Sequence, residues 1–425
     1  MAVLKQQENK LKIKNVIFTK SYTGFYFDDQ AAIKMGALSD GLDYIGSPVT
    51  PGFTKIRQAG EAVSIQLVLE DGSVGYGDCT AVQYSGAAGR DPLFLADEAI
   101  VFLENKIKPL LLNEDVNGFK KLAEKYDHLI IDGNRLHTAV RYGITQAFLS
   151  ATAAYQKLTM AEIIRNEYGI EDDHYETVPV FSQSGDDRYT NADKMIIKEA
   201  PVLPHALINN VEKKLGKKGE LLKEYVVWLR NRIINLRTNP SYSPILHIDT
   251  YGTIGVAFNY NVEKIVKYLE ELNDIASPFH LRIEGPVDSG DRTSTMQYLR
   301  DITKMLDEKD IDVEIVADEW CNTLEDIIYF ADNRAGHMLQ IKTPDLGGIN
   351  NTVEAILYCQ EAKIGAYCGG TCNETDISSH VSMNVAVACK ADQTLGKPGM
   401  GVDEAIMLCV NEINRVCALA NSRNK

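Results

Sequence analysis

Short apolar runs alternate with helix-patterned runs along the second part of the sequence, from residue 171 to the end. The apolar runs have the length of strands, and polar groups gather at their C-terminal ends. Apolar strands separated by helices are typical of a parallel sheet covered by helices, and polar strand ends are typical of a barrel that carries its site at that mouth. The alternation therefore predicts an α/β fold, a (β/α)8 barrel of the TIM type.

The barrel elements can be placed from the same pattern. The strand runs begin near Val178, Val202, Ile245, Phe279, Val313, His337 and Gly365. The helical runs are Val211–Leu236, Val262–Leu272, Asp291–Leu306, Leu324–Phe330, Asn350–Ala362, Asp376–Lys390 and a final helix over Val402–Leu419. An eighth strand is poorly marked, and we expect it near Gly396–Gly401.

The first part of the sequence has a different order of elements. Residues 12–28 alternate apolar and polar positions, and residues 63–69 and 74–78 flank an Asp-Gly turn, which is typical of a hairpin. Helical periodicity follows over residues 92–112, 116–129 and 137–168. Strands followed by helices predict an α+β domain. We therefore expect an N-terminal capping domain over residues 1–170 and a catalytic barrel over residues 171–425.

Net charge, apolar stretches and cysteine positions limit the kinds of partner and the cellular location that we expect for this protein. The net charge of −15 argues against nucleic acid or an anionic membrane as a partner. Neither an apolar stretch long enough to span a membrane nor a signal-peptide core is found. All cysteines except Cys79 follow residue 320, without a Cys-x-x-Cys pair. We interpret them as free thiols and expect a cytoplasmic protein.

Three strand runs end in carboxylates, at Asp249, Glu284 and Asp318. On consecutive strands of one barrel these groups would stand at the same mouth and repel one another unless a cation held them. Oxygen donors without Cys or His favour Mg²⁺ or Mn²⁺ over zinc. The alternative is that each carboxylate caps a helix or pairs with an arginine.

A lysine ends the next strand run, Met338-Leu-Gln-Ile-Lys342, and Thr343-Pro344 follows it at once. A lysine held there away from water can lose its proton and act as a base. The alternative is a solvated or salt-bridged strand end.

Several longer motifs stand out along the chain: Gly24–Asp29, Gln83–Gly86, Phe181–Arg188, Pro204–Asn210, His247–Asp249, Arg282–Pro286, Ala317–Cys321, Gln340–Gly348 and Cys368–Glu374. These motifs resemble the enolase superfamily and, within it, the methylaspartate ammonia-lyase family. The resemblance runs from about residue 12 to the end of the chain. Many superfamily members carry Lys-x-Lys at the base strand, whereas this chain has Gln340-Ile-Lys342.

The resemblance implies reversible elimination of ammonia from L-threo-3-methylaspartate to give mesaconate, in glutamate degradation. Removal of the C3 proton, by Lys342, builds negative charge on the neighbouring carboxylate. Mg²⁺ held by Asp249, Glu284 and Asp318 would stabilise that charge. Nearby Mg²⁺ and burial would lower the pKa of Lys342. The resemblance also implies a homodimer and activation by a monovalent cation such as K⁺.

Five further residues match the family. Gln183, Gln340, Thr371 and Cys372 are implied to bind the substrate, and backbone N–H groups after Gly369-Gly370 could approach an anion. His205, at the end of the second strand, is expected across the mouth from Lys342. It would remove the C3 proton of the erythro epimer and orient the threo epimer. The alternative is that each of these residues is a loop or core residue with a structural role only.

Two other functions stay open on the sequence alone. One is another enolase-superfamily reaction, such as a syn-dehydration or an epimerisation of an amino-acid derivative. The other is a barrel that binds an acidic metabolite, or an assembly subunit, without turnover, although such a protein has no need of a proton base. We also expect residues 185–188 to form a lid or capping loop.

Overall fold

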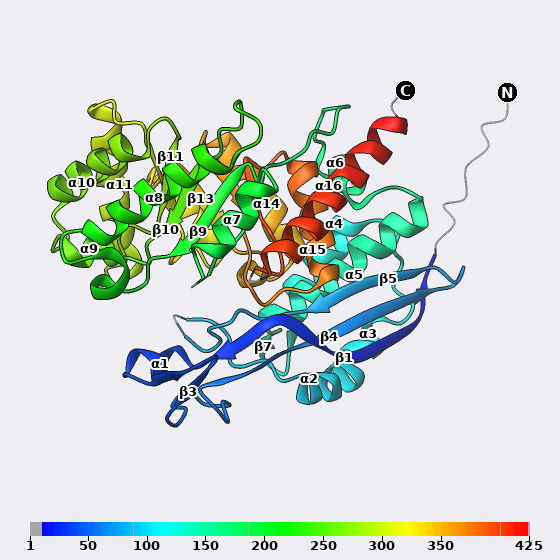
Figure 1. Ribbon diagram of the computed structural model, residues 1–425. Coiled ribbons are helices and arrows are strands. Elements are labelled where there is room, and N and C mark those ends of the chain that lie inside the picture. Colours follow the sequence, from blue (N-terminus) through cyan, green and yellow to red (C-terminus); the bar gives the residue numbers. More distant parts are fainter. Residues whose placement is uncertain (1–10, 88, 186, 400, 424–425) are drawn as a thin grey trace.

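Parallel strands close into a barrel in the order β10-β11-β12-β13-β14-β15-β8-β9 in the computed structural model, which describes residues 11–87, 89–185, 187–399 and 401–423 (Figure 1). The strands are β8 (Val180–Phe181), β9 (Val202–Leu207), β10 (Ile245–Asp249), β11 (Leu281–Glu284), β12 (Val313–Ala317), β13 (Met338–Ile341), β14 (Gly365–Cys368) and β15 (Gln393–Leu395). The predicted barrel is confirmed.

Helices surround the barrel and connect its strands (Figure 1). They are α7 (Thr190–Ile197), α8 (Glu220–Leu236), α9 (Thr253–Ala257), α10 (Val262–Ala276), α11 (Arg292–Glu308), α12 (Leu324–Asp332), α13 (Thr343–Leu346), α14 (Ile349–Glu361), α15 (Asp376–Cys389) and α16 (Val402–Arg423). The helix expected over residues 211–236 is broken into a π-helical turn, η2 (Val211–Leu215), and α8. Gly216 and Gly219, with φ of 87° and 78°, interrupt it in backbone conformations that helices do not use.

The eighth strand lies ahead of its expected position. Residues 396–399 form a connection, residue 400 lies outside the described residues, and the strand is Gln393–Leu395. Its first two residues are polar: Gln393 bonds to His247 and Arg282 inside the barrel, and the Thr394 hydroxyl donates to the carbonyl of Cys368. An apolar run therefore could not mark it. Asp186, within the expected lid over residues 185–188, also lies outside the described residues.

The N-terminal domain combines a three-stranded antiparallel sheet, in the order β1-β4-β5, with helices. Its elements are β1 (Ile13–Asp28), α1 (Gln30–Lys34), β2 (Leu38–Asp40), β3 (Asp43–Ile45), β4 (Arg57–Leu69), β5 (Val74–Cys79), α2 (Ala96–Phe102), η1 (Leu103–Ile107), α3 (Lys108–Leu111), α4 (Phe119–Asp127), β6 (Ile130–Ile131), β7 (Asn134–Arg135), α5 (Thr138–Gln156) and α6 (Met160–Tyr168). The expected hairpin is confirmed as β4 and β5. The single helix expected over 137–168 ends at Lys157, which has φ of 56°, and Thr159 caps α6.

Helix α5 lies between the N-terminal sheet and the barrel, in contact with β4 and β5 on one side and with α13, α14 and α15 on the other. Glycines allow α5 to approach the sheet closely. A Cβ on Gly77 would lie 2.2 Å from the carbonyl oxygen of Gly143, and a Cβ on Gly143 would lie 2.6 Å from the backbone nitrogen of Cys79. The distance between α5 and the N-terminal sheet is thus set by contact between backbones.

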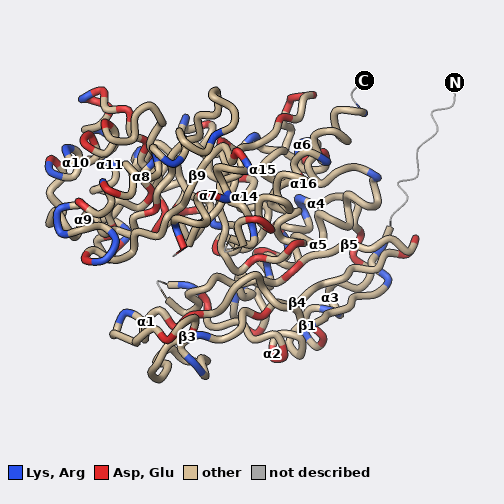
Figure 2. Tube along the Cα trace, viewed as in Figure 1, with Lys and Arg blue, Asp and Glu red and all other residues tan. Residues whose placement is uncertain are grey.

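Charged residues of both signs are interspersed over the outer barrel helices α8, α10 and α11 (Figure 2). Within the described ranges, no helix is both long and apolar enough to cross a membrane.

Gly143→Ala tests the close contact of α5 with β5. The new methyl group would meet the backbone and Sγ of Cys79, which cannot move aside without shifting the sheet. We expect the free energy of unfolding to fall by about 1–3 kcal/mol, despite the better helix propensity of alanine. Urea unfolding followed by circular dichroism measures it. In the control Gly118→Ala, the nearest atom would be 3.6 Å from the new Cβ, so a smaller loss is expected. Equal stability of Gly143→Ala and wild type would contradict this packing.

Candidate active site

A cavity of about 80 Å³ opens at the C-terminal mouth of the barrel, beneath the N-terminal domain. It is lined by Val82, Gln83, Tyr84, Arg90, Gln183, His205, Asp249, Tyr251, Asp318, Glu319, Gln340, Lys342, Gly370, Thr371 and Cys372. Every site residue expected from the sequence lines it except Glu284, which is fully buried. The structure therefore brings the expected residues into one site.

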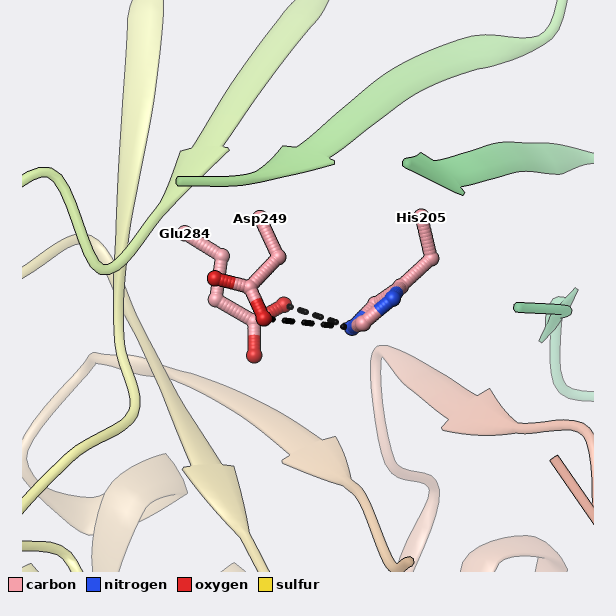
Figure 3. A group of neighbouring side chains, drawn as sticks. All are labelled: His205, Asp249 and Glu284. Atoms are coloured by element: carbon pink, nitrogen blue, oxygen red, sulfur yellow. Dashed lines mark ion pairs between the residues drawn. The ribbon is translucent and has the colours of Figure 1, made fainter. Parts of the chain in front are cut away.

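Asp249 and Glu284 end neighbouring strands and are paired in register. With His205 they form a buried group whose nearest nitrogen and carboxylate oxygens all lie within 4.8 Å of one another (Figure 3). Burial, together with the charge of Asp318, raises the pKa of Asp249 well above its usual range, and burial with the charge of Asp249 does the same for Glu284. Buried carboxylates placed this close are held at lower cost with a cation between them.

Asp318 follows β12 and is paired with Lys342. Its carboxylate lies 2.6 Å from Nζ of Lys342, and burial raises its pKa to about 6. The sequence placed Asp249, Glu284 and Asp318 as equivalent ligands. In the structure Asp249 and Glu284 group with His205, while Asp318 pairs with the lysine.

Glu284 is held by hydrogen bonds inside the barrel. Gln340 donates from Nε2 to Oε1, and His247 Nε2 lies 2.7 Å from Oε2. Because Gln393 donates to Nδ1 of His247, the imidazole carries its proton on Nε2 and donates it to Glu284. Arg282 in turn donates to the amide oxygen of Gln393. This chain of side chains fixes the orientation of Glu284 in the manner of residues that support a metal ligand.

Lys342 directly follows β13 and precedes the short helix α13. Its ammonium contacts Asp318 and lies 3.8 Å from Glu319. Burial lowers the pKa of Lys342, but the charges of these two carboxylates outweigh burial and raise the pKa above its usual range. The sequence predicted a lowered pKa for Lys342, whereas among the chain's own groups the pKa is raised. Lys342 is therefore an ammonium group in this structure.

His205 lies on β9, and β9 and β13 are separated by three strands on either side of the closed barrel. The two strands are therefore opposite each other, so His205 and Lys342 approach the cavity from opposite sides. Nε2 of His205 is 3.6 Å from a carboxylate oxygen of Asp249 and 3.8 Å from one of Glu284. Dashed lines in Figure 3 mark these two contacts. Nδ1 has no hydrogen-bond partner among the described residues. Burial lowers the pKa of His205 to about 4, so the imidazole is neutral.

The four residues expected to bind a substrate offer neutral polar groups to the cavity. Gln183 packs against Gly399, and the Oε1 of Gln340 has no partner among the described residues. The Thr371 hydroxyl accepts from a backbone N–H, which leaves its own proton free to donate. Burial raises the pKa of Cys372 to about 12, so it is a neutral thiol.

Two of the backbone N–H groups after β14 that were expected near an anion are engaged within the protein. The N–H of Gly369 donates to the carbonyl of Tyr367, and the N–H of Thr371 donates to the carboxylate of Glu374. The expectation that these N–H groups bind an anion is therefore wrong for Gly369 and Thr371. The Thr371 side chain is what this segment presents to the cavity.

Five polar lining residues were not expected from the sequence: Gln83, Tyr84, Arg90, Tyr251 and Glu319. Gln83 and Tyr84 lie in a family motif, and Glu319 follows Asp318 directly, so those signals were present. Cys372 donates to Oε1 of Gln83, which joins the N-terminal domain to the barrel loop. Arg90 carries no sequence signal, because its role depends on where the loop after β5 rests on the barrel.

Arg90 joins the two domains by ion pairs. Its guanidinium lies 3.1 Å from Asp345 and 3.7 Å from Glu319, and all three side chains are largely buried. Arg90→Met would leave these carboxylates without this partner, and we expect the free energy of unfolding to fall by about 3–5 kcal/mol. Urea unfolding measures it. In the control Arg232→Met, a half-exposed pair with Asp193 is lost, and about 0–1 kcal/mol is expected. Equal losses in the two variants would contradict a buried role for Arg90.

The comparison with known proteins agrees with this geometry. Residues 11–169 match the family model of the methylaspartate ammonia-lyase N-terminus, and residues 173–422 match that of its C-terminus. The chain is 60% identical over 415 residues to methylaspartate ammonia-lyase of Clostridium tetanomorphum, covering 97% of this chain and 100% of that protein. It is 54% identical over 414 residues to the Citrobacter amalonaticus enzyme of the same name, covering 97% and 100%.

Solved structures are similar over the same length. The magnesium complex of β-methylaspartase from Clostridium tetanomorphum matches with a TM-score of 0.95 and 59% identity, covering 97% of this chain and 100% of that chain. The Citrobacter amalonaticus lyase containing (2S,3S)-3-methylaspartic acid matches with a TM-score of 0.94 and 55% identity, covering 96% and 99%. A muconate lactonizing enzyme from Pseudomonas fluorescens, at 16% identity, a TM-score of 0.60 and coverage of 94% and 88%, shares the fold. The chain therefore belongs to the methylaspartate ammonia-lyase family.

Proposed function

We propose that this chain is a carbon–nitrogen lyase that reversibly eliminates ammonia from L-threo-3-methylaspartate to give mesaconate, as a step in glutamate degradation. The observation that carries the proposal is one small cavity in which Lys342 and His205 face each other across buried carboxylates. Membership of the family supports the reaction, and the Citrobacter structure containing 3-methylaspartic acid supports the substrate.

Asp249, Glu284 and Asp318 are proposed to hold Mg²⁺. Their donor atoms are hard oxygens, and the raised pKa values of Asp249 and Glu284 mark a place where negative charge lacks compensation. The magnesium complex of the Clostridium relative supports the choice of metal. When bound, Mg²⁺ supplies positive charge that stabilises the negative charge developing on the substrate carboxylate.

Lys342 is proposed to remove the C3 proton of the threo substrate. To do so its ammonium must first lose a proton, and the ion pair with Asp318 opposes that loss. Asp318 therefore has to exchange Lys342 for another positive partner before turnover. Once the C3 proton is removed, the C2–N bond breaks and ammonia leaves.

The opposite face of the substrate is proposed to belong to His205. A neutral imidazole with an unengaged Nδ1 can accept a proton, which supports the proposal that this residue acts on the erythro epimer. During threo turnover it would orient the substrate. The amides of Gln183 and Gln340, the hydroxyl of Thr371 and the thiol of Cys372 would hold the substrate by hydrogen bonds without adding charge.

Further proposals concern the state of the protein. We expect a cytoplasmic homodimer that is activated by a monovalent cation such as K⁺. Within each chain, we expect the boundary between the two domains near residue 170. The family resemblance supports each of these points, and the eight free, buried cysteines are in keeping with a reducing compartment. Light scattering tests the dimer, and exchange of K⁺ for Li⁺ in the assay tests the activation.

The metal proposal predicts loss of activity on chelation. EDTA treatment should abolish the release of ammonia and the formation of the conjugated alkene from 3-methylaspartate, and added Mg²⁺ should restore both. Asp249→Asn should lower kcat/KM roughly a hundredfold or more, which corresponds to a loss of about 3 kcal/mol of transition-state stabilisation, because a charged oxygen donor is lost. Ultraviolet absorbance and an ammonia assay measure the two products. Full activity in metal-free protein would count against the proposal, and inactivity of the untreated protein on this substrate would count against the reaction itself.

Two substitutions distinguish the faces of the substrate. Lys342→Ala should lower threo turnover by about 10²–10⁴-fold, which is the usual contribution of a general base, while sparing the erythro epimer. His205→Ala should spare most threo turnover and remove activity on the erythro epimer. Steady-state kinetics on both epimers, with circular dichroism as the control for folding, measure this. Equal losses on both epimers in the His205 variant would indicate a general binding role.

A further inference from the structure

A fully buried ion pair lies directly behind the segment that presents Thr371 and Cys372 to the cavity. Nζ of Lys397 is 3.3 Å from Oε2 of Glu374, and neither side chain is exposed. Glu374 follows β14 and Lys397 follows β15, so the pair joins the ends of neighbouring barrel strands. Neither residue lines the active-site cavity.

The pair is bonded to the segment that binds the substrate. The N–H of Thr371 donates to Oε2 of Glu374, over 3.1 Å. Gly370 is packed against both charged groups, since a Cβ there would lie 2.2 Å from Oε2 of Glu374 and 2.5 Å from Cε of Lys397. The backbone of residues 370–371 therefore rests on the pair.

The pair is also bonded to the residue that follows the base. Lys397 donates from Nζ to Oγ1 of Thr343 over 3.2 Å, and the Thr343 hydroxyl donates to Oε1 of Glu374 over 3.2 Å. Thr343 is buried, begins α13 and is linked to Lys342 by a peptide bond. One carboxylate therefore holds both the substrate-binding segment and the backbone next to the base.

A third contact comes from the N-terminal domain. Tyr142, on α5, donates its hydroxyl hydrogen to Oε1 of Glu374 over 2.7 Å, and this tyrosine is completely buried. Since α5 is fixed on the sheet by contact between backbones, the phenol is a rigid anchor. Glu374 thus accepts hydrogen bonds from three separate parts of the fold.

We propose that Glu374 and Lys397 are positioning residues, which set the distance between the base Lys342 and the substrate held at Thr371 and Cys372. The inference rests on the proposed function, in which those residues serve these roles. Proton transfer requires heavy atoms within hydrogen-bond reach, so small shifts of either segment slow the reaction. Lys397 neutralises the carboxylate that makes the three contacts.

A purely structural ion pair is the competing explanation. Replacing a buried ion pair by apolar side chains of similar volume is often neutral for stability. The double variant Glu374→Leu/Lys397→Met removes both charges and every acceptor oxygen, whereas Glu374→Gln/Lys397→Met removes both charges and keeps an acceptor. A positioning role predicts different kcat/KM values for these two variants, whereas a role in stability alone predicts no such difference.

The first experiment compares the two double variants. We expect Glu374→Leu/Lys397→Met to raise KM and to lower kcat/KM for 3-methylaspartate at least thirtyfold. Glu374→Gln/Lys397→Met should recover at least tenfold of that loss. Hydrogen–deuterium exchange should be at least tenfold faster over residues 369–373 in the Leu/Met variant. Retention of kcat/KM within threefold in the Leu/Met variant, equal losses in both variants, or unchanged exchange would overturn the proposal.

A second experiment leaves the ion pair in place. Thr343→Val keeps the shape of the side chain and removes the hydroxyl that joins the pair to the segment of Lys342, while Thr343→Ser keeps the hydroxyl. We expect Thr343→Val to lower kcat at least tenfold with little change in KM, and to increase the primary deuterium isotope effect at C3. Thr343→Ser should resemble wild type. An unchanged kcat and isotope effect in Thr343→Val would overturn the proposal even if the double variants failed to fold.

The control is an ion pair remote from the cavity. Arg423 and Glu162 join α16 to α6 and are partly buried. Glu162→Gln/Arg423→Met should leave kcat, KM and the exchange of residues 369–373 unchanged, and a change equal to that of the test variants would overturn the proposal. Absence of ammonia release from the wild type would refute the proposed function instead, and the exchange measurement would still decide whether the pair orders the segment.

Discussion

Negative charge buried at one end of a parallel barrel is the constraint on which the rest of this structure depends. Asp249, Glu284 and Asp318 are all at most 5% exposed, and burial raises the pKa of each. Such a cluster is stable only with compensating charge or donors around it. The chain supplies Lys342 beside Asp318, and His247 and Gln340 beside Glu284. The barrel mouth is therefore held together by the same electrostatics that suit it to a cation and an anionic substrate.

The N-terminal domain completes this arrangement as well as covering it. Arg90 brings a positive charge to Glu319 and Asp345, and Gln83 accepts a hydrogen bond from Cys372. Tyr142 donates a hydrogen bond to the carboxylate of Glu374, behind the segment that carries Thr371 and Cys372. Each of these residues is fixed by the packing of the domain on the barrel, so the site is formed only when both parts are in place.

The parts of this molecule that follow from local pattern could be predicted from sequence. Asp249, Glu284 and Lys342 were found because an apolar run ended in a charged residue, which places that residue at the mouth of a parallel barrel. The strand Gln393–Leu395 was expected at the wrong position because Gln393 bonds to polar side chains inside the barrel, so the strand lacks the usual apolar run. Arg90 was missed because its function depends on a contact between domains.

The ion pairing of the site was equally inaccessible from sequence. Spacing along strands predicts that the carboxylates lie at the same mouth of the barrel. It does not determine which of them forms an ion pair with the lysine. Lys342 is next to Asp318 because β12 and β13 are neighbours, and this contact raises the lysine pKa that burial alone would lower. The fold therefore determines the charge state of Lys342, which no single strand encodes.

The glycine contact between α5 and β5 has a consequence for how the enzyme can be altered. With backbone against backbone, this interface has almost no tolerance for added volume. Any substitution that lifts α5 from the sheet also moves the Tyr142 hydroxyl, and with it the Glu374 carboxylate that accepts the N–H of Thr371. The shape of the cavity can thus be altered from residues that do not line it, through the thickness of a single layer of packing.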